Sequence, residues 1–113
     1  MEQNNIIPID LVTNTKNIII YANLCGVKRE DVEIEICGET IMIKGQRKQI
    51  MQEGFKTSQL LVGKIMTTVK LEQNIDPEKT IIEYEDGLLT IRLFIKEHKT
   101  YRFSLMNDYT VSE

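Results

Sequence analysis

The sequence has few of the residues that enzymes and metal sites usually need. Among 113 residues it contains one histidine, two cysteines and no tryptophan. A metal site built on two imidazoles is therefore excluded, and any catalytic triad would depend on His98. Lysines and a glutamate surround His98, and no paired nucleophile motif accompanies it. We interpret His98 as a solvated side chain, and the sequence predicts that the protein is not an enzyme.

Cofactor motifs are also missing. The six glycines are scattered along the chain, so neither a Rossmann fingerprint nor a P-loop is present. The acidic residues between Asp76 and Asp86 lack the alternate spacing of a calcium loop. Cys25 precedes Gly26 and could present a thiol on a sharp turn, but no base is encoded near it, which favours an ordinary turn cysteine. We therefore expect no cofactor and no metal.

The charge balance and the short apolar runs limit the partners and the location. Seventeen acidic and 14 basic residues are mixed along the chain, for a net charge of -3, so no basic patch for nucleic acid or lipid is predicted. No apolar run reaches the roughly 20 residues that span a bilayer. Residues 1–5 do not resemble a secretory signal. We expect a cytoplasmic protein in which Cys25 and Cys37 are free thiols.

What the sequence does contain is alternation with period two, which is typical of strands that bury one face. The run Ile18–Tyr21 is continuously apolar, which predicts a strand covered on both faces. Glu33 and Glu35 alternate with aliphatic residues, so one face of that strand is charged. The positions predicted to share a face within their strands are Ile9 and Leu11; Val32, Ile34 and Ile36; Ile41 and Ile43; and Leu89, Ile91, Leu93 and Ile95.

Turn signals separate these strands. Asp86-Gly87 stands between the β-rich runs Thr80–Tyr84 and Leu88–Leu93, which predicts a tight hairpin. Asn74–Pro77 reads as a turn, and one helical turn is plausible at Lys28–Asp31. Several short strands with frequent turns predict an all-β fold, an immunoglobulin-like antiparallel β-sandwich.

The segment Gln46–Val62 is the longest stretch without a strand pattern. It is longer than most connections inside a compact domain, which suggests a purpose. Its apolar residues need a surface to cover them, and a second subunit would supply one. We therefore predict a homodimer formed by exchange of this segment, with contacts from Ile50, Met51, Phe55, Leu60 and Leu61.

Four short motifs occur in a recognisable order. They are Ala22-x-Leu24-x-Gly26-Val27, Lys28-x-Glu30-Asp31-Val32, Ile41-x-Ile43-x-Gly45-x-Arg47-Lys48 and Gly87-Leu88-Leu89. In this order and spacing they resemble the α-crystallin domain of the small heat-shock proteins, over residues 8–96. The chain departs from that family at Cys25, which replaces a proline, at Thr67, which replaces an arginine, and at Ile82, which replaces an alanine. The tail also lacks the family's Ile-x-Ile/Val motif.

The resemblance implies an ATP-independent holdase that binds partly unfolded client proteins. It also implies a peptide groove between the edges of the strands 32–36 and 80–84, for which the candidates are Val32, Ile34, Ile36 and Ile81. We expect Ile82 to lie in the core. The alternative is a structural or adaptor module with the same fold, such as a spore-coat-type assembly protein. A co-chaperone of the CS-domain type is a weaker possibility, disfavoured by Gly87-Leu88-Leu89.

The two ends complete the predicted organisation into an arm at 1–7, a domain at 8–96 and a tail at 97–113. A short arm and the missing tail motif predict assembly into dimers or small oligomers. In the tail, Tyr101, Phe103 and Leu105 alternate with Arg102 and Ser104. One interpretation is a disordered end. The other is that the three apolar residues dock in the groove in place of the missing motif, because burying them would offset the ordering of a few residues.

Overall fold

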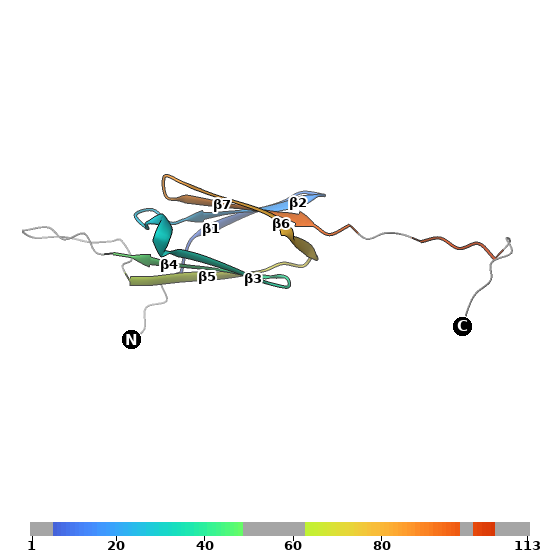
Figure 1. The fold of residues 1–113 in the computed structure, drawn as a ribbon, viewed down its shortest axis with the longest axis horizontal. Coiled ribbons are helices and arrows are strands. Elements are labelled where there is room, and N and C mark those ends of the chain that lie inside the picture. The colour runs from blue at the N-terminus through green and yellow to red at the C-terminus, as the bar shows by residue number, and fades with distance from the viewer. Residues whose placement is uncertain (1–5, 49–62, 98–100, 106–113) are drawn as a thin grey trace, which may run out of the picture.

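The computed structural model describes residues 6–48, 63–97 and 101–105. Within these residues the chain forms strands and one short 3-10 helix, η1 (Figure 1). Among the described residues, no helix has the length and apolar character needed to cross a membrane. The elements in chain order are β1 (Ile9–Thr13), β2 (Asn17–Asn23), η1 (Arg29–Asp31), β3 (Val32–Cys37), β4 (Thr40–Arg47), β5 (Gly63–Lys70), β6 (Ile75–Glu85) and β7 (Leu88–Ile95).

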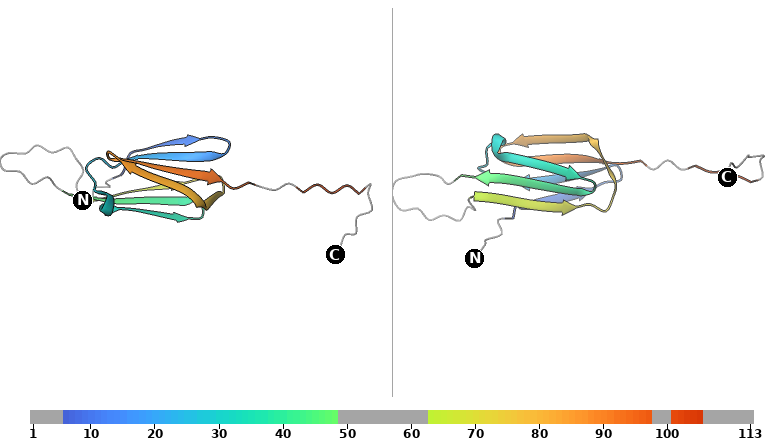
Figure 2. Two further views of the ribbon diagram at one scale, coloured as in Figure 1. Left: turned by 45° about the horizontal axis from the view of Figure 1, so that its top comes forward. Right: turned by 60° about the horizontal axis from the view of Figure 1, so that its bottom comes forward.

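The strands form two antiparallel sheets that pack face to face. One sheet has the order β1-β2-β7-β6 and the other the order β3-β4-β5 (Figure 2). Every strand pairing within the sheets is antiparallel. The predicted all-β sandwich is confirmed. β3 and β6 are edge strands on one side of the sandwich, while β1 and β5 are the edges on the other side.

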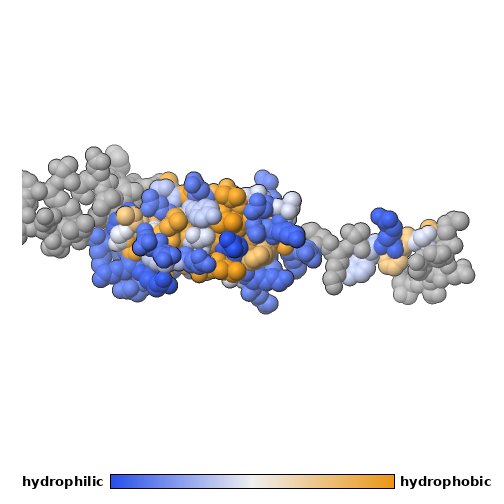
Figure 3. Space-filling model, turned by 90° about the horizontal axis from the view of Figure 1, so that it is seen from above, coloured by the Kyte–Doolittle hydropathy of each residue, from blue (hydrophilic) through white to orange (hydrophobic). Residues whose placement is uncertain are grey.

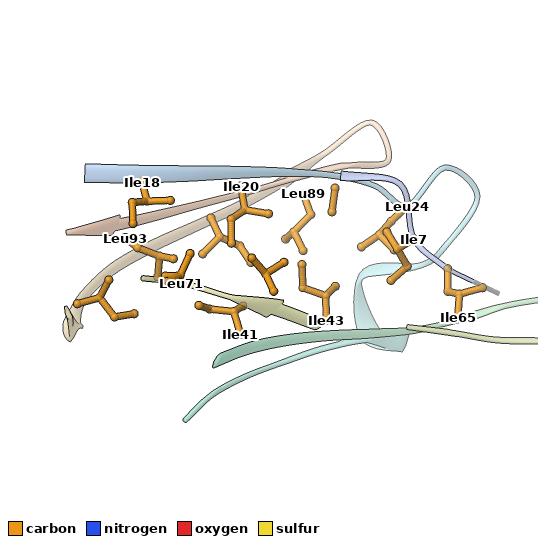
Figure 4. Packing of buried hydrophobic residues seen from close by; sticks show 14 of the residues in the cluster. Ile7, Ile18, Ile20, Leu24, Ile41, Ile43, Ile65, Leu71, Leu89 and Leu93 are labelled. Atoms are coloured by element: carbon orange, nitrogen blue, oxygen red, sulfur yellow. The ribbon is translucent and has the colours of Figure 1, made fainter. Parts of the chain in front are cut away.

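The core lies between the sheets and is almost entirely aliphatic. Ile20 pairs with Ile91 in one sheet, and both are fully buried. Ile41 and Ile43 of the other sheet point toward them, as Figure 4 shows for the labelled side chains. Directly opposite residues in an antiparallel pair share a face, so the alternating sets of the sequence pack inward together. The buried residues of the core include Ile18, Ile20, Ala22, Leu24, Ile41, Ile43, Ile65, Leu89, Ile91 and Leu93.

One face was predicted wrongly. The run Ile18–Tyr21 indicated a strand covered on both sides, but none of the described elements packs on the outer side of β2. Ile18 and Ile20 are buried, whereas Ile19 and Tyr21 are only half-buried. Their neighbours on the outer face include the exposed Val12. Figure 3 looks onto this face and shows apolar side chains gathered among polar ones. The apolar run therefore reflects an unusually apolar outer face.

β6 begins earlier than the sequence suggested. The segment Asn74–Pro77 was predicted as a turn, but the strand already starts at Ile75. The pairing with β7 is irregular between Asp76 and Ile81. Pro77 lies in this irregular part of an edge strand, where its missing N–H interrupts no regular ladder. A bulge thus lets the strand run through a sequence that looks like a turn.

The N-terminal residues close one side of the sandwich. Ile7 is only 2% exposed, and its backbone N–H donates to the carbonyl oxygen of Met66 in β5 at 3.3 Å. Ile6 forms a parallel bridge with the same Met66. Because Ile7 also leads directly into β1, the segment joins the two edge strands β1 and β5. Ile6 and Ile7 were assigned to the arm, but by these contacts they belong to the sandwich.

Candidate functional site: the edge groove between β3 and β6

The opposite side of the sandwich is formed by the edge strands β3 and β6, and none of the described strands lies between them. Within residues 6–48, 63–97 and 101–105, β3 pairs in a sheet only with β4 and β6 only with β7, so each strand has one edge without a neighbouring strand there. Such an edge can accept an additional strand. We call the space between these two edges the edge groove.

The β3 wall of the edge groove combines an apolar inner side with a charged outer side. Val32, Ile34 and Ile36 are half-buried and pack against the core, while Glu33 and Glu35 are exposed. Ile34 stands opposite Ile43 of β4, which is fully buried. On the inward face of this sheet, the residues of β4 are therefore fully covered, whereas those of the edge strand β3 are partly exposed.

On β6, the residue that faces the groove is Ile82, and the predicted candidate Ile81 does not face it. Ile82 stands opposite the buried Ile91, so it faces inward, whereas Ile81 stands opposite the exposed Arg92, so it faces outward. Ile82 is 47% exposed, although it was predicted to lie in the core. Ile81 was predicted to line the groove and lies on the outer face of the sheet. The bulge between Asp76 and Ile81 sets which residue faces inward, and alternation alone could not show it.

Thr80 gives the β6 wall a polar position. Its Oγ1 atom is buried and has no hydrogen-bond partner among the described residues. In an extended strand, Thr80 and Ile82 lie on the same face. A buried hydroxyl without a partner is unfavourable, and a donor or acceptor brought in by a bound chain would relieve it.

One end of the edge groove is closed by side-chain hydrogen bonds to the loop that leads into β3. The Tyr84 hydroxyl lies 3.0 Å from the carbonyl oxygen of Leu24 and close to that of Val27, so its single proton is shared between them. Arg29 Nη2 donates to the carbonyl oxygen of Tyr84 at 2.7 Å. Arg47 Nε donates to the carbonyl oxygen of Cys25 at 2.8 Å. We call Tyr84, Arg29, Arg47 and the loop 24–27 the latch.

Backbone packing supports the latch from below. The Leu24 N–H donates to the carbonyl oxygen of Gly87 at 2.7 Å. A Cβ atom on Gly87 would lie 2.9 Å from the Cα atom of Cys25, closer than side chains tolerate. Asp86 and Gly87 have φ values of 53° and 81°, which fits the predicted tight hairpin. The motif at 22–27 and the motif at 87–89 are therefore in direct contact.

The environment of Tyr84 favours its neutral form. Burial of the ring raises the pKa of the phenol above its ordinary value of 10.0, and the thiol of Cys25 acts in the same direction. Arg47 and Arg29 lower the pKa but do not reverse the shift. The phenol therefore keeps its proton at neutral pH and can donate it to the loop carbonyls.

Comparison with known proteins identifies the family. The sequence profile of the Hsp20/alpha crystallin family matches residues 10–103, which is most of the chain. The chain belongs to the Hsp20/alpha crystallin family. This is a family of non-enzymatic chaperones, which agrees with the prediction that the chain is not an enzyme. The sandwich is thus an α-crystallin domain, as the sequence motifs suggested.

Individual relatives are distant. The 17.4 kDa class III heat shock protein of Arabidopsis thaliana is 29% identical over 97 residues, which cover 78% of this chain and 63% of that protein. The chain therefore spans less than two thirds of this relative. A probable 15 kDa heat shock protein of Leptospira interrogans is 25% identical over 102 residues, which cover 88% of this chain and 78% of that protein.

Solved structures share the fold. A small heat-shock protein from Xylella fastidiosa superposes with a TM-score of 0.78 at 20% identity, over 94% of this chain and all of that one. Heat shock protein 16.0 from Schizosaccharomyces pombe gives a TM-score of 0.73 at 23% identity, over 88% of this chain and 96% of that chain. At these identities the likeness concerns the architecture.

The remaining candidates predicted from the sequence are the tail residues, the exchange residues, His98 and the two cysteines. Tyr101, Phe103 and Leu105 are 73%, 73% and 89% exposed, and residues 101–105 form no strand in the single chain. Their docking stays a prediction. The exchange residues Ile50, Met51, Phe55, Leu60 and Leu61 lie outside the described residues, as does His98. Both cysteines are exposed free thiols.

Two residues of the site were missed by sequence reasoning. Tyr84 and Arg29 were not singled out, although they hold the loop before β3. They are 55 positions apart in the sequence, and no spacing rule connects them. The sequence pointed to them only indirectly: Arg29 lies within the motif at 28–32, and Tyr84 ends the β-rich run before the Asp86-Gly87 hairpin.

Proposed function

We propose that this chain is an ATP-independent holdase that binds partly unfolded proteins in the edge groove. The observation that carries this proposal is the row of half-covered aliphatic residues on two strands with unpaired backbone edges. Val32, Ile34 and Ile36 supply one wall, and Ile82 supplies the other. Membership of the Hsp20/alpha crystallin family supports the same function.

An extended client segment fits this arrangement by strand addition. Its backbone would pair with β3 or β6, and every second side chain would meet the aliphatic row. Full burial of one aliphatic side chain contributes about 1.5–3 kcal/mol. Two or three such contacts, reduced by the loss of chain freedom on binding, give weak and reversible association. Association of this strength would hold an unfolded client in solution and still allow its release.

The simplest test is suppression of aggregation. A heat-denatured test enzyme is mixed with the chain at near-equal amounts, without nucleotide, and light scattering is followed. We expect the scattering to fall well below that of the enzyme alone. Scattering that stays unchanged would favour the alternative, a structural or adaptor module that kept the sandwich without the holdase activity.

We also propose that the protein associates with itself through β1. Leu11 lies opposite the buried Ile20 and so faces inward, yet it is 48% exposed because β1 is an edge strand. A strand from the Gln46–Val62 segment of a second copy would pair with β1 and cover Leu11. Deleting Ile50–Gln59 and closing the gap with a Gly-containing turn should then give a monomer in light scattering. A variant that stays dimeric contradicts the exchange.

The tail is our candidate for an internal occupant of the edge groove. With Tyr101, Phe103 and Leu105 pointing inward, Arg102 would point outward between the exposed glutamates of the two walls, Glu35 on β3 and Glu83 on β6. Truncation after Lys99 should lower the melting temperature or change the oligomer, and it should increase client binding. A truncated chain that melts, assembles and binds like the full chain would show that the tail does not dock.

The proposed partners are therefore a second copy of this chain and partly unfolded client proteins, in the cytoplasm. Nucleic acid and membranes are not among them, on the charge balance of the sequence. Retention of the purified chain on heparin or anionic vesicles at physiological salt would contradict this part of the proposal.

A further inference from the structure

We infer that Tyr84 is a positioning residue that fixes the β3 wall of the edge groove relative to the β6 wall. This inference rests on the proposed function of the groove. Tyr84 stands opposite the buried Leu89, so its half-buried ring belongs to the inner row of β6. Its hydroxyl, at the far end of the ring, holds the loop that leads into β3. One side chain thus touches both walls.

Among the described residues, the latch connects the two walls by hydrogen bonds. In the described part of the chain, β3 and β6 belong to different sheets, and each pairs only with its inner neighbour. The Tyr84 hydroxyl and Arg29 join β6 to the segment immediately before β3. With edge strands paired on one side only, the width of the groove at this end depends on these hydrogen bonds.

The loop is stiff enough to transmit a movement to β3. Leu24 and Val27 are 0% and 5% exposed, so both ends of the loop are anchored in the core. The Val27 N–H donates to the carbonyl oxygen of Leu24, and the Asp31 N–H donates to that of Lys28, both at 2.9 Å. Val32, the first aliphatic residue of the groove, follows Asp31 directly in the chain. A shift of the loop therefore displaces the wall.

Removing only the hydroxyl separates positioning from packing. Tyr84→Phe keeps the ring, its place in the inner row and the hydrogen bond that Arg29 donates to the backbone of residue 84. It deletes the donor shared by the carbonyls of Leu24 and Val27. The global fold should survive, whereas the loop and the start of β3 should open more often.

The test compares three variants of the full chain. Tyr84→Phe is matched by Tyr21→Phe, because Tyr21 is a half-buried tyrosine on the outer face of the same sheet. Ile20→Val serves as a second control, because Ile20 is fully buried in the core away from the latch and its truncation lowers global stability without removing a latch hydrogen bond. Hydrogen exchange is measured for the amides of Val27, Asp31 and β3, with β2 and β7 as internal references. Affinity is measured by fluorescence anisotropy with labelled, reduced and carboxymethylated α-lactalbumin, a permanently unfolded probe.

We expect Tyr84→Phe to speed exchange in the loop and β3 by roughly tenfold relative to β2 and β7, and to weaken probe binding by roughly three- to tenfold. Tyr21→Phe should change neither the exchange of the loop and β3 relative to β2 and β7 nor the probe affinity. Ile20→Val, which destabilises the reference strands themselves, should not speed the loop and β3 relative to β2 and β7 and should leave the probe affinity unchanged. Unchanged loop exchange in Tyr84→Phe would overturn the inference, and so would faster exchange with unchanged affinity. A probe that does not bind the wild-type chain would refute the proposed function, and the exchange data would then decide alone whether Tyr84 holds the wall.

Discussion

The two long sides of this sandwich are built from the same kind of strand and end differently. On the side of β1 and β5, Ile7 crosses from one sheet to the other and is 2% exposed. On the side of β3 and β6, Ile82 faces inward and is 47% exposed. Residue type does not separate the two sides, because both present isoleucine to the interior. The difference, in the part of the chain that the structure describes, is whether a further segment lies across the space between the two sheets.

This difference separates stability from binding within one small domain. Burial of a covered aliphatic side chain stabilises the folded domain. A half-covered side chain stabilises it less, because part of its apolar surface becomes buried only when a partner binds. The covered Ile7 should therefore support the stability of the domain, whereas the half-covered inward residues should support binding, Leu11 of β1 to a second copy and Ile82 of β6 to a client. Each of the following predictions tests that division.

The largest effect should come from the closed side. Ile7→Ala removes a buried side chain and should lower the free energy of unfolding by about 2–5 kcal/mol, the range typical for buried isoleucine. Ile82→Ala removes the same atoms from a half-exposed site and should cost less than about 1 kcal/mol. Urea denaturation of both variants measures this. Equal decreases in the free energy of unfolding would contradict the proposed difference, because both sides of the sandwich would then stabilise the fold to the same extent.

The next effect concerns the closed end of the open side. In Gly87→Ala the new Cβ would meet the Cα of Cys25 at 2.9 Å, in a residue with φ of 81°. Gly38→Ala is the matched control, with φ of 60° and no atom within 4 Å of the new Cβ. In both variants the left-handed backbone conformation should lower the free energy of unfolding by about 1 kcal/mol. Gly87→Ala should lose about 1–3 kcal/mol more in chemical denaturation because of the clash. Similar losses in the two variants would contradict the close contact.

A smaller effect sharpens the assignment of faces on β6. Ile82→Ser should weaken binding of an unfolded client up to about tenfold, which corresponds to about 1.4 kcal/mol. Ile81→Ser, one residue away on the outer face, should leave the affinity within about twofold, because the outer face does not line the groove. Fluorescence anisotropy with a labelled unfolded protein measures both. The reverse ranking would restore the assignment made from the sequence.

The smallest effect should appear with pH. The pKa of Tyr84 is higher in the folded chain than its ordinary value of 10.0, so the folded state holds the phenol proton more tightly than the unfolded state. The resulting stabilisation is complete below pH 10 and is lost as the pH rises through the folded pKa. Wild type should therefore lose stability above pH 10 more steeply than Tyr84→Phe, measured by urea denaturation in steps of pH. Parallel curves for the two proteins would contradict this.

Much of the sandwich could be predicted because burial repeats with the period of a strand. The inward positions Leu89, Ile91 and Leu93 were correct, and the predicted run through Ile95 coincides with the end of β7. The hairpin at Asp86-Gly87 was also correct, since only a left-handed backbone closes so tight a turn. Local sequence carries these features because they depend on neighbours along the chain.

The rest depends on contacts that local sequence does not contain. The irregular pairing after Asp76 changes which of two adjacent isoleucines faces inward, so Ile81 was chosen in place of Ile82. The role of Ile7 follows from β5, nearly 60 positions later in the chain. Tyr84 belongs to the site because its hydroxyl contacts the carbonyl oxygens of Leu24 and Val27, which lie 60 and 57 positions away in the sequence.

An open edge also exposes a protein to runaway polymerisation with its own copies, and β3 carries a safeguard against it. In a pairing of two β3 strands that keeps both apolar faces inward, Glu33 or Glu35 of one copy stands opposite a glutamate of the other. Like charges directly opposite each other destabilise a strand pair. Replacing both glutamates by threonine should therefore permit fibril growth that thioflavin T detects, whereas the wild-type chain stays free of fibrils. We therefore expect the groove to select by sign of charge, binding a neutral or basic strand in preference to another copy of β3.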